Sequence, residues 1–171
     1  MTMIDQRPAE VDARRQLGHW EGDLIVGTNC RSAIATLVER ISRFLVMVQL
    51  PDGHTAPAVS DALVAALAAL PVGAITSLTW DQGTELAQHR EITSACGVSI
   101  YFCEPHSPWQ RGTNENTNRL LRQYFPKGID ISGFSQAKLS ATARQLNERP
   151  RKTLQYQTPA QKFEACVAAT R

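Results

Sequence analysis

The chain has 171 residues, 43% of them hydrophobic and 20% charged, which is the composition of one globular domain and not of a disordered chain. Its net charge of +2 conceals an uneven distribution, because residues 1–100 carry 7 basic and 11 acidic side chains and residues 101–171 carry 11 basic and 5 acidic ones. The longest mainly apolar stretch, residues 62–74, is too short for a membrane span. The basic last third indicates an anionic partner.

The cysteines and the chain ends bear on compartment and domain boundaries. Four single cysteines without the spacing of a zinc site are expected to be reduced thiols of a cytoplasmic protein, with Cys96 and Cys103 buried. The first residues lack the apolar run of a signal peptide. We expect a flexible N-terminal arm over residues 1–16, one domain over residues 17–165 and a tail over residues 166–171.

Three strands are predicted first. Residues 17–26 alternate in polarity, which places Glu21 and Asp23 on the same side of a strand. Residues 32–38 and 44–50 are apolar and rich in β-branched side chains, and the short polar stretch between them is typical of a hairpin. Because the connections are short, the three strands are expected to be antiparallel.

Helices and strands alternate in the middle of the chain. A helix is expected to begin after Thr55, which is a candidate N-cap, and to end at Pro71. Residues 74–80 are predicted as a strand, residues 85–96 as a helix and residues 98–102 as a strand. This alternation indicates parallel strands joined by helical crossovers.

The last third is predicted to be helical. One helix is expected over residues 111–124, and a second is expected to be capped by Ser135 and stopped by Pro150. Three antiparallel strands followed by two parallel ones, with helices between and after them, predict an α/β fold. Its sheet is a five-stranded mixed sheet flanked by helices, which is the layout of an RNase H-like domain.

Three acidic side chains occupy positions that suit metal-dependent chemistry. Asp23 lies inside the first predicted strand, Asp81 follows the fourth strand, and Glu115 lies in the first turns of the helix after the fifth. In an RNase H-like topology these carboxylates converge, and Mg²⁺ prefers such oxygen ligands. Acids at a sheet edge are more often solvated charges, so spacing alone leaves both interpretations open. The rival acids, expected to be structural or supporting, are Glu21, Glu85 and Glu104.

The helix that carries Glu115 also carries a basic face. Arginines and asparagines around a metal-binding acid suit a phosphate backbone, although exposed ion pairs such as Glu115 with Arg119 are the simpler explanation. The aromatic ring at position 109 either stacks on a base or packs on the protein. The side chains expected to contact DNA are Trp109, Arg111, Asn114, Asn118, Arg119, Arg122, Lys127, Arg149, Arg151 and Lys152.

Several segments resemble the catalytic core of insertion-sequence-thirty-type transposases, which belong to the DDE transposase and retroviral-type integrase superfamily. They are GHWEGDLIVG, SAIATLVERISRF, LTWDQGTELAQH, SPWQRGTNENTNRLLRQYFPKG and LNERPRKTLQYQTPAQKF. The resemblance spans about residues 17–164. It implies that Asp23, Asp81 and Glu115 are the three catalytic and metal-binding acids, with 33 residues between the second and the third.

The resemblance implies a metal-dependent polynucleotidyl transferase. Two Mg²⁺ ions, or Mn²⁺ as a substitute, would activate water to cut one DNA strand, and the freed 3′-hydroxyl would then attack target DNA. The expected partners are transposon ends, target DNA and further copies of the chain in a homodimer or higher oligomer, with no membrane. Members of this family carry N-terminal helix-turn-helix segments, and residues 1–16 cannot form one, so we expect an isolated core or a truncated copy.

Two alternatives remain from the sequence. One is an RNase H-like nuclease with the same fold and a different task. The other is a transposase remnant that binds DNA or oligomerises without catalysis.

Overall fold

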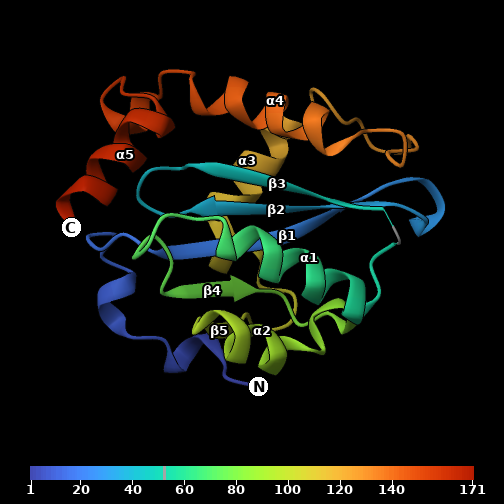
Figure 1. The fold of residues 1–171 in the computed structure, drawn as a ribbon, viewed down its shortest axis with the longest axis horizontal. Helices are drawn as coiled ribbons and strands as arrows, with labels where there is room; N and C mark the ends of the chain where they lie inside the picture. Colours follow the sequence, from blue (N-terminus) through green and yellow to red (C-terminus); the bar gives the residue numbers. More distant parts are fainter. Residues whose placement is uncertain (52) are drawn as a thin grey trace.

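The computed structural model describes residues 1–51 and 53–171, which form a five-stranded mixed sheet with helices on both faces (Figure 1). The strands are β1 (His19–Val26), β2 (Ala33–Glu39), β3 (Leu45–Leu50), β4 (Ser77–Trp80) and β5 (Ser99–Phe102). Their order across the sheet is β3-β2-β1-β4-β5. β1, β2 and β3 are antiparallel, whereas β4 runs parallel to both β1 and β5. The predicted mixed topology is therefore confirmed.

Five α-helices cover the sheet. They are α1 (Ala56–Ala68), α2 (His89–Cys96), α3 (Gly112–Leu121), α4 (Gln136–Asn147) and α5 (Pro159–Ala169). In Figure 1, α1 lies in front of the sheet and α3 behind it, while α4 runs along the β3 edge. The sequence reading missed α5, although Thr158 and Gln161 form a capping box at its start. None of the helices in the described residues is long and apolar enough to cross a membrane.

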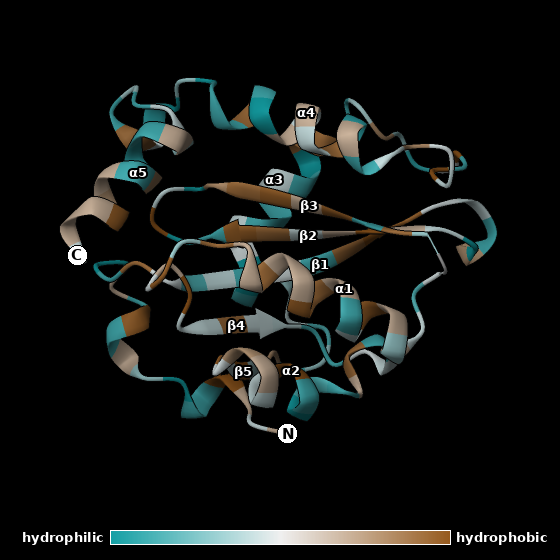
Figure 2. Ribbon diagram, in the orientation of Figure 1, coloured by the Kyte–Doolittle hydropathy of each residue, from teal (hydrophilic) through white to brown (hydrophobic). Residues whose placement is uncertain are grey.

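The predicted alternation along β1 divides the core into two clusters. Trp20 and Leu24 pack with α1 and α2 on one face of the sheet, and Ile25 packs with α3 and α4 on the other. β2 and β3 are the most continuously hydrophobic ribbons in the view of Figure 2, because both of their faces are covered. Glu21 and Asp23 share the face on which α3 packs, so this face meets the helix with acids as well as apolar groups.

A glycine in β1 brings the second aspartate close to the first. An added Cβ at Gly22 would overlap the ring of Trp80, so the ring packs directly over the β1 backbone. The Trp80 indole N–H donates to the Glu85 carboxylate at 3.1 Å. Since Asp81 follows Trp80 directly, the packing of the Trp80 ring on Gly22 fixes the end of β4 beside the strand that carries Asp23.

The outer edge of β3 is covered by side chains of α4. The Asn147 side chain accepts from the Leu45 N–H at 2.8 Å and donates to the Leu45 carbonyl at 2.9 Å. Gln136 does the same for the Gln49 N–H and the Met47 carbonyl, both at 2.8 Å. Amide side chains thus occupy main-chain groups that a further strand would otherwise use.

Both chain ends differ from their expected descriptions. The expected N-terminal arm is packed on the sheet: Val11 is 2% exposed, the Thr2 carbonyl accepts from the Phe102 N–H at 2.9 Å, and Arg7 donates to Thr79 at 3.0 Å. The expected C-terminal tail continues α5, in which Val167 is buried. Polar composition suggested a loose arm because its few anchoring side chains have no periodic pattern.

Candidate active site

Asp23 and Asp81 converge on one guanidinium group. Asp23 lies within β1 and Asp81 directly follows β4. Arg111, in the 3-10 turn before α3, places Nη1 3.2 Å from Asp23 Oδ1 and Nη2 3.3 Å from Asp81 Oδ2. Its Nη1 also donates to the Gly22 carbonyl at 3.0 Å. The structure therefore brings two of the three expected acids to one cation.

The two carboxylates remain open to solvent, whereas the cation between them does not. The side chains of Asp23 and Asp81 are 31% and 50% exposed, and Arg111 is 5% exposed. Burial disfavours the charge of Arg111, but the adjacent Asp23, Cys103 and Asp81 outweigh it and raise the arginine pKa above its ordinary value. The cluster thus has a buried positive centre between two accessible acids.

Backbone and amide donors hold each carboxylate in place. Asp23 Oδ1 accepts from the Leu24 N–H at 2.8 Å, and Asp23 Oδ2 accepts from the Asn118 side chain at 3.2 Å. Asp81 Oδ1 accepts from the Gln82 N–H at 2.8 Å. Asn118 lies on α3, so the helix that packs on this face of the sheet fixes the orientation of Asp23.

Glu115 lies in the first turn of α3, one helical turn after Arg111, and is half-buried. Within residues 1–51 and 53–171, no three Asp, Glu, His or Cys side chains are grouped closely enough to hold a metal ion together. Asp23 and Asp81 nevertheless fit a divalent cation in donor type, because their oxygens are hard ligands that already converge on positive charge. In this structure the Arg111 guanidinium lies where the oxygens of the two aspartates converge.

Two of the expected DNA contacts lie in the protein interior. Asn114 is fully buried: its N–H donates to Glu21 Oε2 at 2.9 Å, and its side chain donates to the Glu21 and Thr36 carbonyls at 3.1 and 3.3 Å. The expectation that Arg111 and Asn114 are exposed beside Glu115 is therefore wrong. A helical wheel assigns polar residues to solvent, but β1 offers them buried hydrogen-bonding partners.

The rival acids have structural partners. Glu21 is buried and pairs with Arg40 at 3.0 Å. Glu85 accepts from Trp80, as described above, and Glu104 accepts from the Gln110 side chain at 3.5 Å. These contacts agree with the supporting roles expected for the three acids.

The remaining expected DNA contacts are mostly accessible. Trp109 is 71% exposed, so it does not pack into the core. Arg122 is half-buried and donates to the Phe125 carbonyl at 3.4 Å, and Arg149 donates to the Tyr124 hydroxyl at 2.9 Å. Among these expected contacts, the exposed basic side chains are Arg119, Lys127, Arg149 and Lys152.

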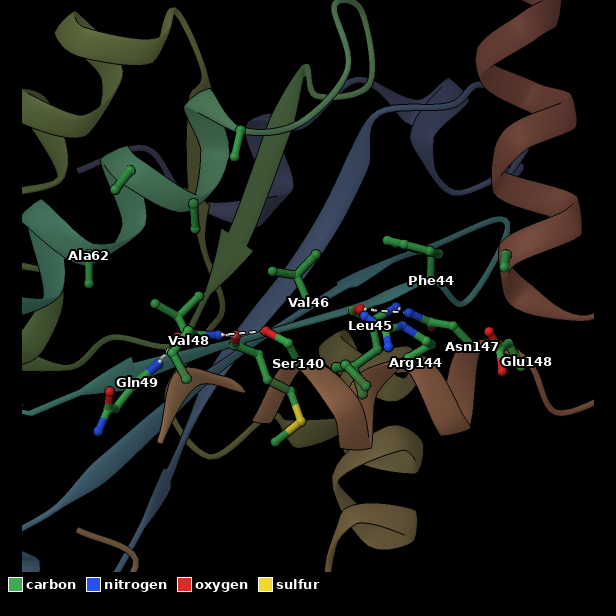
Figure 3. A pocket seen from close by; sticks show the side chains of 17 residues that line it. Phe44, Leu45, Val46, Val48, Gln49, Ala62, Ser140, Arg144, Asn147 and Glu148 are labelled. Carbon is green, nitrogen blue, oxygen red and sulfur yellow. Dashed lines mark hydrogen bonds between the residues drawn. The ribbon is translucent and has the colours of Figure 1, made fainter. Parts of the chain in front are cut away.

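A separate apolar groove lies between α1, β3 and α4 (Figure 3). It encloses about 550 Å³ and is lined on the α1 side by alanines, among them Ala62. The hydrogen bonds between Leu45 and Asn147, two of its lining residues, join β3 to α4 and are drawn as dashed lines. Neither Asp23 nor Asp81 lines this groove, so it is not part of the acidic site.

Comparison with known proteins places the chain in a family. Residues 13–108 match the family described as integrase core domain, a stretch that contains Asp23 and Asp81 and ends before Glu115. The chain belongs to this family.

Curated relatives are transposases. The chain is 52% identical over 169 residues to "Transposase InsI for insertion sequence element IS30A" of Escherichia coli (strain K12), covering 99% of this chain and 44% of that protein. It is 52% identical over 168 residues to "Transposase for insertion sequence element IS1086" of Cupriavidus metallidurans, covering 98% and 49%. These matches confirm the resemblance to insertion-sequence-thirty-type cores. The chain spans about half the length of these relatives.

Solved structures confirm the RNase H-like fold. The catalytic core domain of BIV integrase superposes with a TM-score of 0.64 at 20% identity, covering 90% of this chain and 98% of that one. A chain from the simian T-cell lymphotropic virus intasome in complex with the PP2A regulatory subunit B56 gamma superposes with a TM-score of 0.67 at 20% identity. That match covers 86% of this chain and 54% of the other.

Proposed function

We propose that this domain is the catalytic core of a transposase that cuts a DNA strand at an element end and joins the freed 3′-hydroxyl to target DNA. The observation that carries the proposal is the convergence of Asp23 and Asp81 on one position, within an integrase core domain. Two accessible carboxylates that already converge on the positive charge of Arg111 would take a divalent cation in its place. Its relatives by name act at insertion sequence elements.

The three acids divide the work of binding metal. Asp23 and Asp81 would hold divalent cations, Mg²⁺ or Mn²⁺, and Glu115 would complete the set from α3. Two such ions, when bound, activate the attacking oxygen and stabilise the leaving one in a phosphoryl transfer. Asn118 is a positioning residue, because its amide bonds Asp23 Oδ2 and so orients the opposite oxygen. Arg111 holds the two aspartates together and yields contacts to them as a metal binds.

The exposed basic side chains would hold the DNA backbone. Arg119 follows Glu115 by one turn of α3, and Lys127 and Lys152 extend the positive charge beyond the helix. Trp109 presents an exposed ring on which a base can stack. Phosphate contacts of this kind are sensitive to salt. The proposed partners are two element ends and target DNA, with a homodimer or larger assembly acting at the nucleoid.

The test is a cleavage and joining assay with the whole chain, labelled element-end DNA, target DNA and Mg²⁺ or Mn²⁺. Asp23→Asn, Asp81→Asn and Glu115→Gln are expected to abolish product, since each removes a ligand charge. Glu104→Gln is the matched control, because this carboxylate accepts from the Gln110 side chain and does not take part in the Arg111 bridge, so the change should leave product formation unchanged.

The products separate the proposal from its alternatives. Joined strands support a transposase, whereas cleavage without joining identifies a nuclease of the same fold. DNA binding without either product identifies a non-catalytic remnant. Equal product from wild type and Asp81→Asn would refute the assignment of the acids.

A further inference from the structure

Three arginines from distant parts of the chain gather at the N-terminal end of α3. Arg14, Arg43 and Arg151 line a cavity of about 220 Å³. The other lining residues are Gly112, Thr113, Asn116, Thr117 and Thr153. The cavity is thus bounded by three cationic side chains, the first turns of a ten-residue helix, and hydroxyl or amide groups.

Arg14 and Arg43 converge on the same neutral acceptors. Their Nη1 atoms donate to the Thr113 hydroxyl at 2.7 and 2.8 Å, and both donate to the Arg40 carbonyl, at 2.9 and 3.1 Å. Both arginines also have a left-handed backbone, with φ of 51° and 63°. Two guanidinium groups are therefore held side by side without a negative charge between them.

Arg151 completes the cluster and is weakly bonded. Its Nη2 donates to the Leu146 carbonyl at 3.3 Å, and its Nε is buried without a hydrogen-bond partner. Among the residues that the structure describes, none of the three arginines has a carboxylate within 4.0 Å. Burial first, and neighbouring arginines second, lower the pKa of Arg14 and of Arg151.

The nearest acids are engaged elsewhere. Glu21 pairs with Arg40 and accepts from the Asn114 N–H. Glu39 accepts from the N–H groups of Ile41 and Ser42 and from the Ser42 hydroxyl, at 2.7 to 2.9 Å. Both carboxylates attract Arg43, but the bonds that they make fix them away from the cavity. The cluster is left with surplus positive charge.

We propose that this cavity binds a phosphate group, and that the phosphate belongs to the backbone of bound DNA. Guanidinium groups form paired, charge-assisted hydrogen bonds to phosphate oxygens, and three of them line this cavity. That space is several times the volume of about 30 Å³ that one water molecule takes in the liquid. The partial positive charge of the helix N-terminus adds to the attraction.

The location gives the phosphate a task. Gly112 lines the cavity and follows Arg111 directly, and Glu115 lies three residues further along α3. A DNA strand anchored here is tied to the helix that carries Glu115 and that begins directly after Arg111. The choice of DNA as the source of the phosphate rests on the proposed function, whereas the phosphate site itself does not.

The first experiment measures thermal unfolding of the whole chain with and without inorganic phosphate at constant ionic strength. Phosphate should raise the Tm of wild type, and Arg151→Gln or Arg43→Gln should remove most of that rise. Arg90→Gln, a change to an exposed arginine on α2, is the matched control and should keep it. Without phosphate, Arg151→Gln should unfold at or above the wild-type Tm, because it relieves repulsion and loses one weak bond. A phosphate effect equal in wild type and both variants would overturn the site.

The second experiment measures DNA binding by fluorescence anisotropy at several salt concentrations. Each lost phosphate contact makes the negative slope of log K, the DNA association constant, against log salt shallower by about 0.9 for duplex DNA. Arg151→Gln should therefore make the slope shallower by about that amount. If Arg151→Gln leaves this slope unchanged while wild type is still stabilised by inorganic phosphate, the cavity binds free phosphate, and the proposal that the phosphate comes from DNA is overturned. A wild type that shows the phosphate effect but binds no DNA contradicts the proposed function and leaves the phosphate site standing.

Discussion

Replacing Arg111 by glutamine should destabilise the metal-free domain by removing the bridge between the two aspartates. The variant loses two charge-assisted contacts, at 3.2 and 3.3 Å, and one bond to the Gly22 carbonyl at 3.0 Å. Because Asp23 and Asp81 are partly exposed, solvent limits each ionic contact to about 1 kcal/mol. The buried carbonyl bond adds about 1 kcal/mol, and release of a buried charge offsets part of the sum. We expect a net loss of about 2 kcal/mol.

A loss of that size lowers the Tm by about 4–8 °C in a domain of this length, measured by circular dichroism in the presence of a chelator. Arg119→Gln, on the exposed side of the same helix, should leave the Tm unchanged. Millimolar Mg²⁺ should then stabilise Arg111→Gln more than wild type, because two uncompensated carboxylates attract the ion more strongly. Unfolding of Arg111→Gln at the wild-type temperature would refute the bridge, and equal stabilisation by Mg²⁺ would refute competition between arginine and metal.

Three further predictions concern the packing of β1, the burial of a thiol and the edge of β3. Gly22→Ala should destabilise the fold by about 1–3 kcal/mol in urea unfolding, because its Cβ meets the Trp80 ring, and an unchanged midpoint would contradict this packing. Burial raises the pKa of the Cys103 thiol to about 11, so iodoacetamide should label Cys103 much more slowly than the exposed Cys30 near neutral pH. The labelling rate of Cys103 should rise only in strong alkali, and equal rates for the two cysteines at neutral pH, measured by mass spectrometry, would contradict the burial of Cys103. Asn147→Ala should lower stability by about 2 kcal/mol through two lost bonds to the β3 edge, whereas Gln145→Ala, exposed on the same helix, should not.

The fold was predictable where one physical signal dominated. The alternation along β1 gave the correct two faces, and Ser135 caps α4 as expected by accepting from the Lys138 N–H at 3.2 Å. Thr55 precedes α1 as expected, although its side chain makes no capping bond. The positions of strands with clear hydrophobic patterns, and of helices with recognisable end residues, can therefore be predicted from the local sequence.

The N-terminal segment and the interior of α3 depended on partners far away in sequence. Arg7 and Val11 are held by the sheet, and nothing near them in the sequence announces those contacts. Arg111 and Asn114 are buried because β1 supplies acceptors about 90 residues earlier in the chain. Periodicity sorts residues by polarity and so misplaces polar groups that bond inside the protein.

The candidate site was predictable in position more than in contacts. The places of Asp23 on β1 and of Asp81 after β4 follow from topology, and the structure brings the two together. The role of Glu115 as third acid stays a prediction, since its side chain joins no three-acid cluster in the part of the chain described. The arginine between the aspartates was missed, because its spacing from Glu115 indicated a solvent-facing turn.

The amide groups that α4 places along β3 have a consequence for shortened copies of this gene. A product ending before Gln136 would keep every strand and all three expected acids. It would also uncover an edge whose sequence, Leu-Val-Met-Val-Gln-Leu, carries no charge to repel a neighbour. Copies of such a fragment should pair along their β3 edges and precipitate. α4 is therefore needed to keep the domain in solution, although it contributes none of the three expected acids.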